Sequence, residues 1–159
     1  MPKFVKTFFL TMFLVSAAFS ENAGFGSIAS DRNKPIYFNS DSLIFNQKDN
    51  SAELFDEIEI IQGKSILSAE HVKVIYSKTD NKLEKIFAEI NVVFKSGKDI
   101  AKAENAVYSF SEDTISLSGN AQLFQGSNSI LADQILINTK TGLTQMLGGV
   151  KTIISPSAN

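Results

Sequence analysis

The stretch Ala132-Asp133-Gln134-Ile135-Leu136-Ile137 places an acidic residue directly before a short apolar run. The same arrangement occurs three more times, as Ser40-Asp41-Ser42-Leu43-Ile44-Phe45, Ala69-Glu70-His71-Val72-Lys73-Val74 and Ala103-Glu104-Asn105-Ala106-Val107-Tyr108. The four acids are 29, 34 and 29 residues apart. This internal repeat predicts four units of about thirty residues. Because a unit of that size cannot bury its apolar face alone, the units must stack into one continuous core.

Apolar side chains within the units recur with a period of two, which is typical of strands with one buried face. The clearest cases are Ile58-Glu59-Ile60, Val72-Lys73-Val74 and Thr114-Ile115-Ser116-Leu117-Ser118. A turn signal follows each acid after eight to eleven residues, at Asp49-Asn50, Asp80-Asn81, Glu112-Asp113 and Thr141-Gly142. Each unit therefore begins with a hairpin, and a second short strand is expected to start at Asp56, Ala88, Gly119 and Gly148.

One stretch is ambiguous between helix and strand. Residues 80–90 place Leu83, Ile86, Phe87 and Ile90 at helix-like spacing, but the stretch is short and lies between two strand signals. We interpret it as a hairpin arm.

The N-terminus has the pattern of a secretory signal peptide over residues 1–20. Lys3 and Lys6 precede the apolar run 8–19, which at about 1.5 Å per residue is shorter than the roughly 30 Å of a hydrocarbon core. An uncleaved membrane anchor is the alternative. Residues 21–35 are small and polar and are expected to form a mobile leader. The strand pattern fills residues 36–154, and residues 155–159 form a tail.

Composition excludes several classes of protein. The chain has 159 residues, a formal net charge of −2, 43% hydrophobic residues and no cysteine. It is therefore neither disordered nor held by disulfides, and it lacks the positive field that attracts nucleic acid.

Candidate catalytic and metal-binding groups are few. His71 is the single histidine, and without cysteine there is no thiol nucleophile and no multi-histidine metal site. Lys140-Thr141-Gly142 is a turn, and Gly148-Gly149 is interpreted as a bulge or strand entry, because no helix pattern follows it. The wide spacing of Asp41, Glu70, Glu104 and Asp133 predicts hydrogen bonds to turn backbone rather than a calcium site. No enzyme activity, metal or cofactor is expected.

Three further stretches accompany the acid-led strands, namely Gly-Asn-Ala-Gln-Leu-Phe-Gln-Gly at 119–126, Leu-Ala-Asp at 131–133 and Thr-Gly-Leu-Thr-Gln-Met-Leu-Gly-Gly at 141–149. Together these residues resemble the OstA-like family of lipopolysaccharide export proteins. The resemblance covers residues 36–154. Where family repeats usually carry glycine before the second strand, this chain has Asp56 and Ala88 in its first two units, which leaves the geometry of those two turns open.

The resemblance implies an all-β protein, an open-ended antiparallel β-jelly roll whose apolar interior accepts the acyl chains of lipopolysaccharide. It also implies end-to-end assembly into a periplasmic bridge between LptC-like inner-membrane and LptD-like outer-membrane proteins. Two alternatives remain, namely a membrane-anchored LptC-like partner and a structural β-solenoid with a filled core and no lipid.

Strand parity selects the residues expected on one apolar face, which are candidates for lipid contact. They are Leu43, Phe45, Ile58, Ile60, Val72, Val74, Tyr76, Val92, Phe94, Tyr108, Phe110, Leu117, Leu123, Ile135 and Ile137. Any β-sandwich has such a face in order to fold, so periodicity alone favours a core, and the family resemblance favours a lipid-binding groove.

The two ends of the predicted roll carry weakly protected edge strands. At one end, Pro35 is followed by Ile36, Tyr37 and Phe38. At the other end, the only charged residue in the run that contains Val150, Thr152 and Ile153 is Lys151. Because the two ends differ in sequence, their pairing would be head-to-tail self-association rather than a closed dimer.

Overall fold

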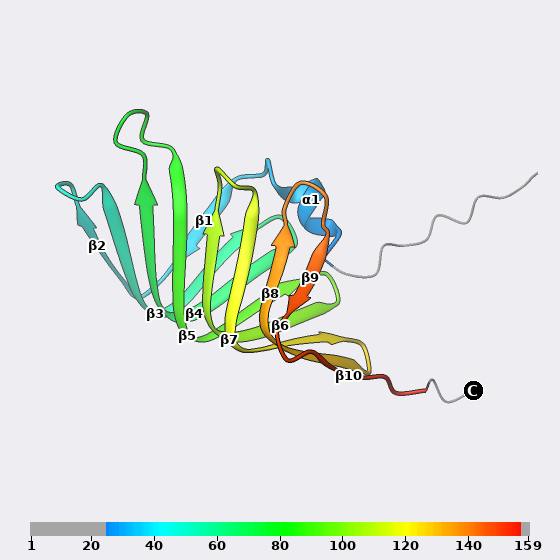
Figure 1. The fold of residues 1–159 in the computed structure, drawn as a ribbon. Coiled ribbons are helices and arrows are strands. Elements are labelled where there is room, and N and C mark those ends of the chain that lie inside the picture. Colours follow the sequence, from blue (N-terminus) through cyan, green and yellow to red (C-terminus); the bar gives the residue numbers. More distant parts are fainter. Residues whose placement is uncertain (1–24, 157–159) are drawn as a thin grey trace, which may run out of the picture.

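The computed structural model describes residues 25–156, which form one antiparallel sheet of ten strands and a short helix (Figure 1). Six long strands make up most of the sheet, each hydrogen-bonded to the next along the chain. In chain order the elements are α1 (Ser27–Asp31), β1 (Ile36–Asn39), β2 (Ser42–Asn46), β3 (Ser51–Gln62), β4 (Ser65–Tyr76), β5 (Leu83–Ser96), β6 (Asp99–Ser109), β7 (Thr114–Gln125), β8 (Asn128–Asn138), β9 (Thr144–Leu147) and β10 (Lys151–Ile153). The hairpin arm expected over residues 80–90 is confirmed, because most of that stretch lies in β5.

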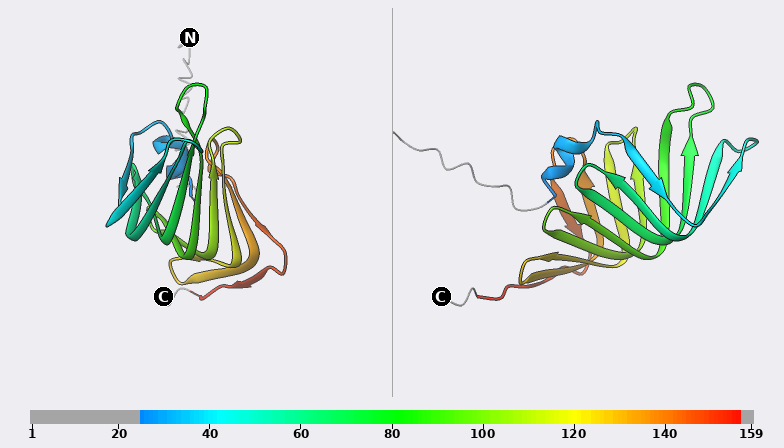
Figure 2. Two further views of the ribbon diagram at one scale, coloured as in Figure 1. Left: turned by 90° about the vertical axis from the view of Figure 1, so that its left-hand side faces the viewer. Right: turned by 180° about the vertical axis from the view of Figure 1, so that it is seen from behind.

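The sheet is open, and each end is formed by two short strands in place of one long one. β1 and β2 pair with the two halves of β3, and β10 and β9 pair with the two halves of β8. The long strands descend from one row of turns, bend, and continue into a second layer (Figures 1 and 2). An unclosed antiparallel sheet folded into two layers confirms the predicted open-ended β-jelly roll.

The bend lies at the same level in every strand. In β3, β5 and β7 two consecutive residues have positive φ there, and a fourth pair separates β9 from β10; they are Asp56-Glu57, Ile90-Asn91, Gly119-Asn120 and Gly148-Gly149. The register shifts at the same points, as expected for β-bulges, which bend a strand and increase its twist. We call this line of bulges the bend row.

The bend row corrects two expectations from the sequence. Each long strand runs through the bend without ending, so the units contain long bent strands where several short ones were expected. The break expected at Ala88 is also wrong, because Ala88 is buried and pairs with Val72, and the bulge comes two residues later at Ile90-Asn91. The longer hairpin loop of the second unit displaces the bulge along the chain.

Three of the four repeated acids, those in β4, β6 and β8, lie opposite the bulges, and the fourth, Asp41, lies between β1 and β2, where its backbone N–H donates to the carbonyl oxygen of Asp56 at 3.1 Å. The side-chain amide of Asn91 donates to Glu70, and that of Asn120 donates to Oε1 of Glu104 over 2.7 Å. Asp133 lies against Gly148, whose carbonyl oxygen accepts a hydrogen bond from the Asp133 backbone N–H at 2.9 Å. The expected partner of the Glu70 and Glu104 side chains was a turn backbone, whereas the structure provides an asparagine amide.

Gly119 offers a sharp test of this packing. Its φ is +81°, and a Cβ added there would lie 2.8 Å from Cβ of Glu104, an atom fixed close to the backbone. We expect Gly119→Ala to lower the free energy of unfolding by about 2–4 kcal/mol, from backbone strain plus the clash. Gly126→Ala is the matched control: φ is +61°, but no other atom lies within 4 Å, so the loss should be only about 1–2 kcal/mol. Equal losses in urea unfolding would contradict the close packing at the bend.

The N-terminal segment differs from the mobile leader expected over residues 21–35. Residues 21–24 lie outside the described part of the chain, but residues 25–34 pack onto the roll. Phe25 is fully buried and Ile28 is 5% exposed, and the Phe25 ring lies 5.2 Å from that of Phe94. The small polar composition of the stretch hides these two apolar anchors, which sit three residues apart around the single turn of α1. The signal peptide predicted over residues 1–20 also lies outside the described residues.

Candidate functional site

The apolar interior between the two layers contains most of the candidate lipid-contact residues. Ten of the fifteen are buried: Ile58, Ile60, Val72, Val74, Val92, Phe94, Leu117, Leu123, Ile135 and Ile137. Tyr76, Tyr108 and Phe110 are half-buried and pack against the same cluster, with the rings of Tyr108 and Phe110 stacked at 4.1 Å. Strand parity therefore identifies one continuous apolar surface that runs the length of the roll.

The interior surface continues past the closed core at the β2 end. Leu43 and Phe45 are 56% and 51% exposed, yet their cross-strand partners in β3, Leu54 and Ala52, are buried. Side chains directly opposite each other in a ladder share a face, so Leu43 and Phe45 extend the interior face into solvent. The apolar lining is therefore open at this end of the molecule.

Sequence reasoning missed several interior residues. Leu67, Ala101 and Ala132 precede the acids in β4, β6 and β8 and are buried, although they have the opposite parity to the interior residues after the acid. The register shift at each acid changes which parity faces inward. Alanines also give a weak hydrophobic signal, and Ala52, Ala88, Ala106 and Ala121 are buried as well.

The row of turns opposite the bend is spanned by residues 25–34. Beneath them the interior retains an apolar cavity of about 40 Å³, lined from both layers and from this segment. Its wall includes Ile28 and Asp31 of α1, Phe94 of β5 and Tyr108 of β6. A space of that size admits a few waters at most and no acyl chain.

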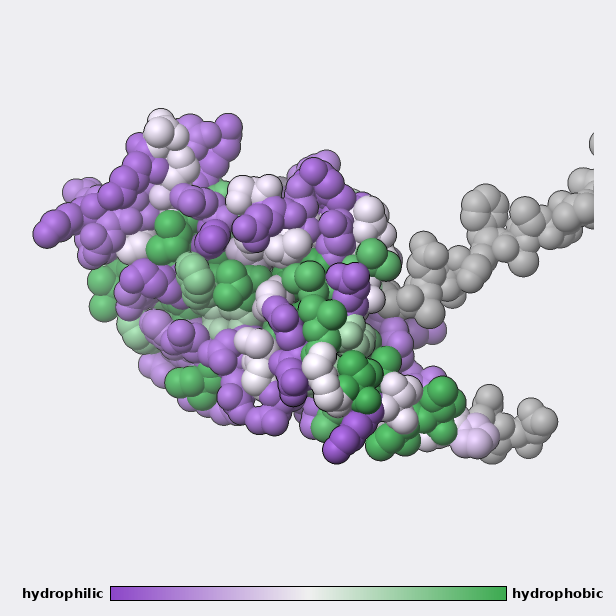
Figure 3. All heavy atoms as spheres, viewed as in Figure 1, coloured by the Kyte–Doolittle hydropathy of each residue, from purple (hydrophilic) through white to green (hydrophobic). Residues whose placement is uncertain are grey.

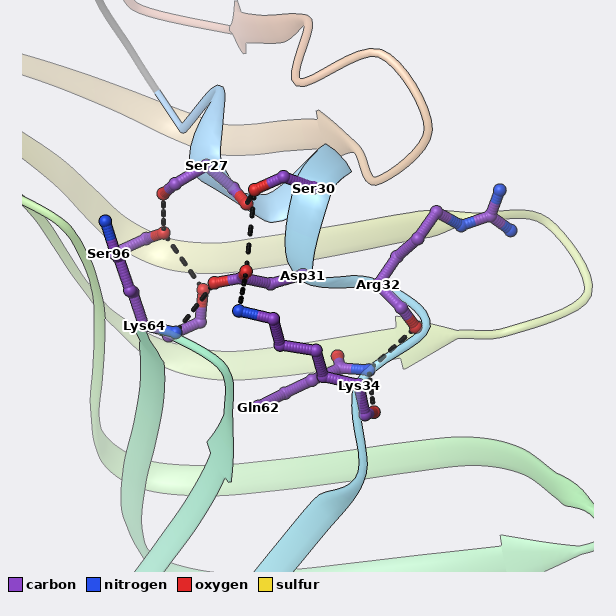
Figure 4. Close-up of polar contacts among 9 residues, drawn as sticks. Ser27, Ser30, Asp31, Arg32, Lys34, Gln62, Lys64 and Ser96 are labelled. Atoms are coloured by element: carbon purple, nitrogen blue, oxygen red, sulfur yellow. Dashed lines mark hydrogen bonds and ion pairs between the residues drawn. The ribbon is translucent and has the colours of Figure 1, made fainter.

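Asp31 fixes the segment to the β3–β4 turn (Figure 4). Asp31 is 3% exposed, and its carboxylate accepts hydrogen bonds from the backbone N–H of Lys64 at 2.7 Å and from Nζ of Lys34 at 2.7 Å. The Lys34 contact and then the Lys64 N–H hold the pKa of Asp31 below its usual value, so the carboxylate is charged at neutral pH. Gly63 makes the approach possible, since a Cβ there would lie 2.2 Å from the Asp31 carboxylate.

A chain of hydroxyl groups holds the start of the same segment. Ser27 Oγ lies 2.7 Å from Ser96 Oγ, which lies 2.9 Å from Ser65 Oγ. Ser65 and Ser96 are buried at the ends of β4 and β5. Ser27 therefore extends the hydrogen bond between the Ser65 and Ser96 hydroxyls into a chain of three hydroxyls that ties α1 to the end of β5.

The other layer holds the segment through charge. Arg32 pairs with Asp113 in the β6–β7 turn, and Lys140 Nζ lies 2.6 Å from the other oxygen of the same carboxylate. Lys140 and then Arg32 hold the pKa of Asp113 below its usual value. Residues 25–34 therefore contact both layers across the row of turns, and we call them the clasp.

His71 lies on the outer face of the sheet, apart from the interior. Its ring nitrogens are 3.5 Å from Glu53 and 3.3 Å from Glu89, and its ring lies 5.1 Å from that of Phe55. Across residues 25–156 no group of three or more acidic or histidine side chains is placed to hold a metal ion. Within the same part of the chain no helix has the length and apolar character needed to span a bilayer.

The predicted edge residues lie on the short end strands. Tyr37 is 61% exposed, while Ile36 and Phe38 on either side of it pack partly against the core. At the other end Val150, which precedes β10, is 49% exposed, and Ile153 is 60% exposed. Figure 3 shows apolar side chains gathered at the end formed by β9 and β10.

Most of this fold matches the model of one protein family. The model of the family described as "LptA/(LptD N-terminal domain) LPS transport protein" matches residues 37–143, about two thirds of the chain. The chain belongs to this LptA/LptD N-terminal family. The matched segment runs from β1 to the turn before β9, so the family pattern and the folded repeat coincide.

Among solved structures, one similar member of the LptA group comes from Pseudomonas aeruginosa. It is LptH, described as the LptA homologous periplasmic component of the conserved lipopolysaccharide transport device. The alignment has 18% identity and a TM-score of 0.69, and it covers 80% of this chain and 99% of LptH. At this identity the likeness supports the fold. No curated protein sequence matches the chain.

Proposed function

We propose that this protein is a periplasmic lipopolysaccharide transport protein, which shields acyl chains inside the apolar roll while they cross between membranes. The observation that carries the proposal is the continuous apolar interior, exposed at the β2 end through Leu43 and Phe45, in a chain of the LptA/LptD N-terminal family. The fifteen candidate residues are proposed to contact the acyl chains. No chemical step is part of this function.

The size of the hydrophobic effect explains why such a protein is needed. Exposing a CH₂ group to water costs about 0.8 kcal/mol. Transfer of one acyl chain of about 12 carbons from water to an apolar environment is therefore favourable by roughly 10 kcal/mol. A carrier must replace that environment without holding the lipid so tightly that transfer stops. The repeated interior of Val, Ile and Leu side chains along β3–β8 supplies an even lining rather than one deep pocket.

Photo-crosslinking in cells that export lipopolysaccharide tests the proposal. A benzoylphenylalanine at Tyr108, an aromatic residue on the wall of the interior, is expected to capture lipopolysaccharide. Failure of this probe to capture lipid in a folded, exported protein would remove the interior from the transport path.

We also propose that copies of the chain join head to tail, with β1 and β2 of one copy beside β9 and β10 of the next. All four are short end strands that pair on one side only within the described chain. The same edges would meet LptC-like and LptD-like proteins at the two ends of a bridge. The free edges and the exposed apolar residues Tyr37, Ile44, Ile153 and Ile154 support this assembly.

The proposed location is the periplasm, after cleavage of the signal peptide at residues 1–20. The cationic and apolar pattern of that segment supports the proposal. N-terminal sequencing of the exported protein distinguishes cleavage near Ser20 from an LptC-like anchored form that keeps Met1.

A further inference from the structure

The clasp places its own apolar side chains where a lipid would lie. Phe25 is fully buried against Phe94, and Ile28 forms part of the wall of the cavity between the layers. Phe94 and Tyr108, which line the same cavity, are among the residues proposed to contact acyl chains. With residues 25–34 docked, only about 40 Å³ remains there.

From this geometry we infer that the clasp is a displaceable plug, which occupies an acyl-chain subsite and must leave before lipid enters the middle of the roll. The inference rests on the proposed transport function. It assigns Phe25 and Ile28 as stand-ins for the lipid and the cavity wall as the acyl-chain subsite that they cover.

The apolar part of the plug is small. It buries two large side chains, whereas an acyl chain brings about a dozen methylene groups to the same surface. An entering chain can therefore replace the apolar contacts that Phe25 and Ile28 make with this surface.

The polar part of the clasp makes it reversible. Asp31, Ser27 and Arg32 hold it through the Lys64 N–H, the Ser96 hydroxyl and Asp113. Each of these partners lies near a turn at the rim, where water or the polar part of a lipid can replace the contact. The clasp can therefore detach without unpairing any strand of the sheet.

The chain offers a direct test because it has no native cysteine. Ser27 Oγ and Ser96 Oγ are 2.7 Å apart, so S27C and S96C place two sulfurs within reach of a disulfide that fastens α1 to β5. The matched control is S68C with V93C, which joins paired residues of β4 and β5 and leaves the clasp free. Both variants carry benzoylphenylalanine at Tyr108 and are mixed with purified rough lipopolysaccharide.

We expect oxidised S27C/S96C to capture at least about tenfold less lipid than the same protein after reduction. Oxidation of the S68C/V93C control should leave capture unchanged. A second variant without a disulfide, F25A with I28A, should load lipid faster than the wild type and retain the circular dichroism of the sheet.

The outcomes separate the two hypotheses. Equal capture by oxidised and reduced S27C/S96C overturns the plug and leaves the transport function standing. No capture by any reduced or wild-type form overturns the transport function, and the plug with it. Slower loading by the F25A/I28A variant also overturns the plug, because it would mean that the clasp assists lipid entry.

Discussion

Phe94→Asp is expected to unfold the roll or to leave it barely stable. Phe94 is 4% exposed between the layers and contacts Phe25, so the new carboxylate would be buried without a partner. An unpaired buried charge costs about 4 kcal/mol or more, against a total stability of about 5–15 kcal/mol for a domain. Urea unfolding followed by circular dichroism measures the loss.

Lys95→Asp is the matched control for this substitution. Lys95 is the next residue of β5 and is exposed on the outer face, so the same new side chain should change stability by only about 0.5 kcal/mol. If the two variants unfold at the same urea concentration as the wild type, water already reaches Phe94 and the closed interior described above is wrong.

Thr152→Pro is expected to abolish or strongly shorten linear oligomers of the mature protein. β10 has three residues, all exposed, and pairs with residues 129–131 of β8 on one side. Proline removes a backbone N–H, either from the free edge or from the bonds that hold β10 in place, so the strand can no longer template another copy. The long strands β3–β8 do not depend on this residue.

Thr152→Val is the control, because it changes the side chain and retains the N–H. Light scattering across a wide range of protein concentration should show growing oligomers for the wild type and for Thr152→Val, and small species for Thr152→Pro. A strictly monomeric wild type, or a closed dimer that Thr152→Pro leaves intact, would contradict edge-to-edge assembly.

The repeat made the architecture predictable from the sequence. Four acid-led strands at nearly constant spacing fix the stacking of units, and alternation fixes which side chains face inward after each acid. The position of the bend was less predictable where glycine is absent. At Ile90-Asn91 a β-branched residue adopts positive φ, which intrinsic propensity disfavours and which the surrounding ladder imposes.

The clasp could not be predicted, for a different physical reason. Residues 25–34 contain only the short helix α1, and their docking depends on partners far away in the chain, such as Ser96 and Asp113. Local pattern contains no signal of such contacts. The exposure of Leu43 and Phe45 also depends on tertiary structure. Their positions in the strand predict the interior face correctly, but no opposing layer covers them, so they are exposed to solvent.

Photo-crosslinking at Tyr108 in exporting cells shows whether lipopolysaccharide passes through the interior of the roll. Val107 is the control position, since it neighbours Tyr108 in β6 and lies on the opposite face of the strand. If the lipid takes this path, Tyr108 should crosslink to lipopolysaccharide and Val107 should give little or no crosslink. Capture from Val107 alone, or from neither position in a folded and exported protein, would contradict passage through the interior.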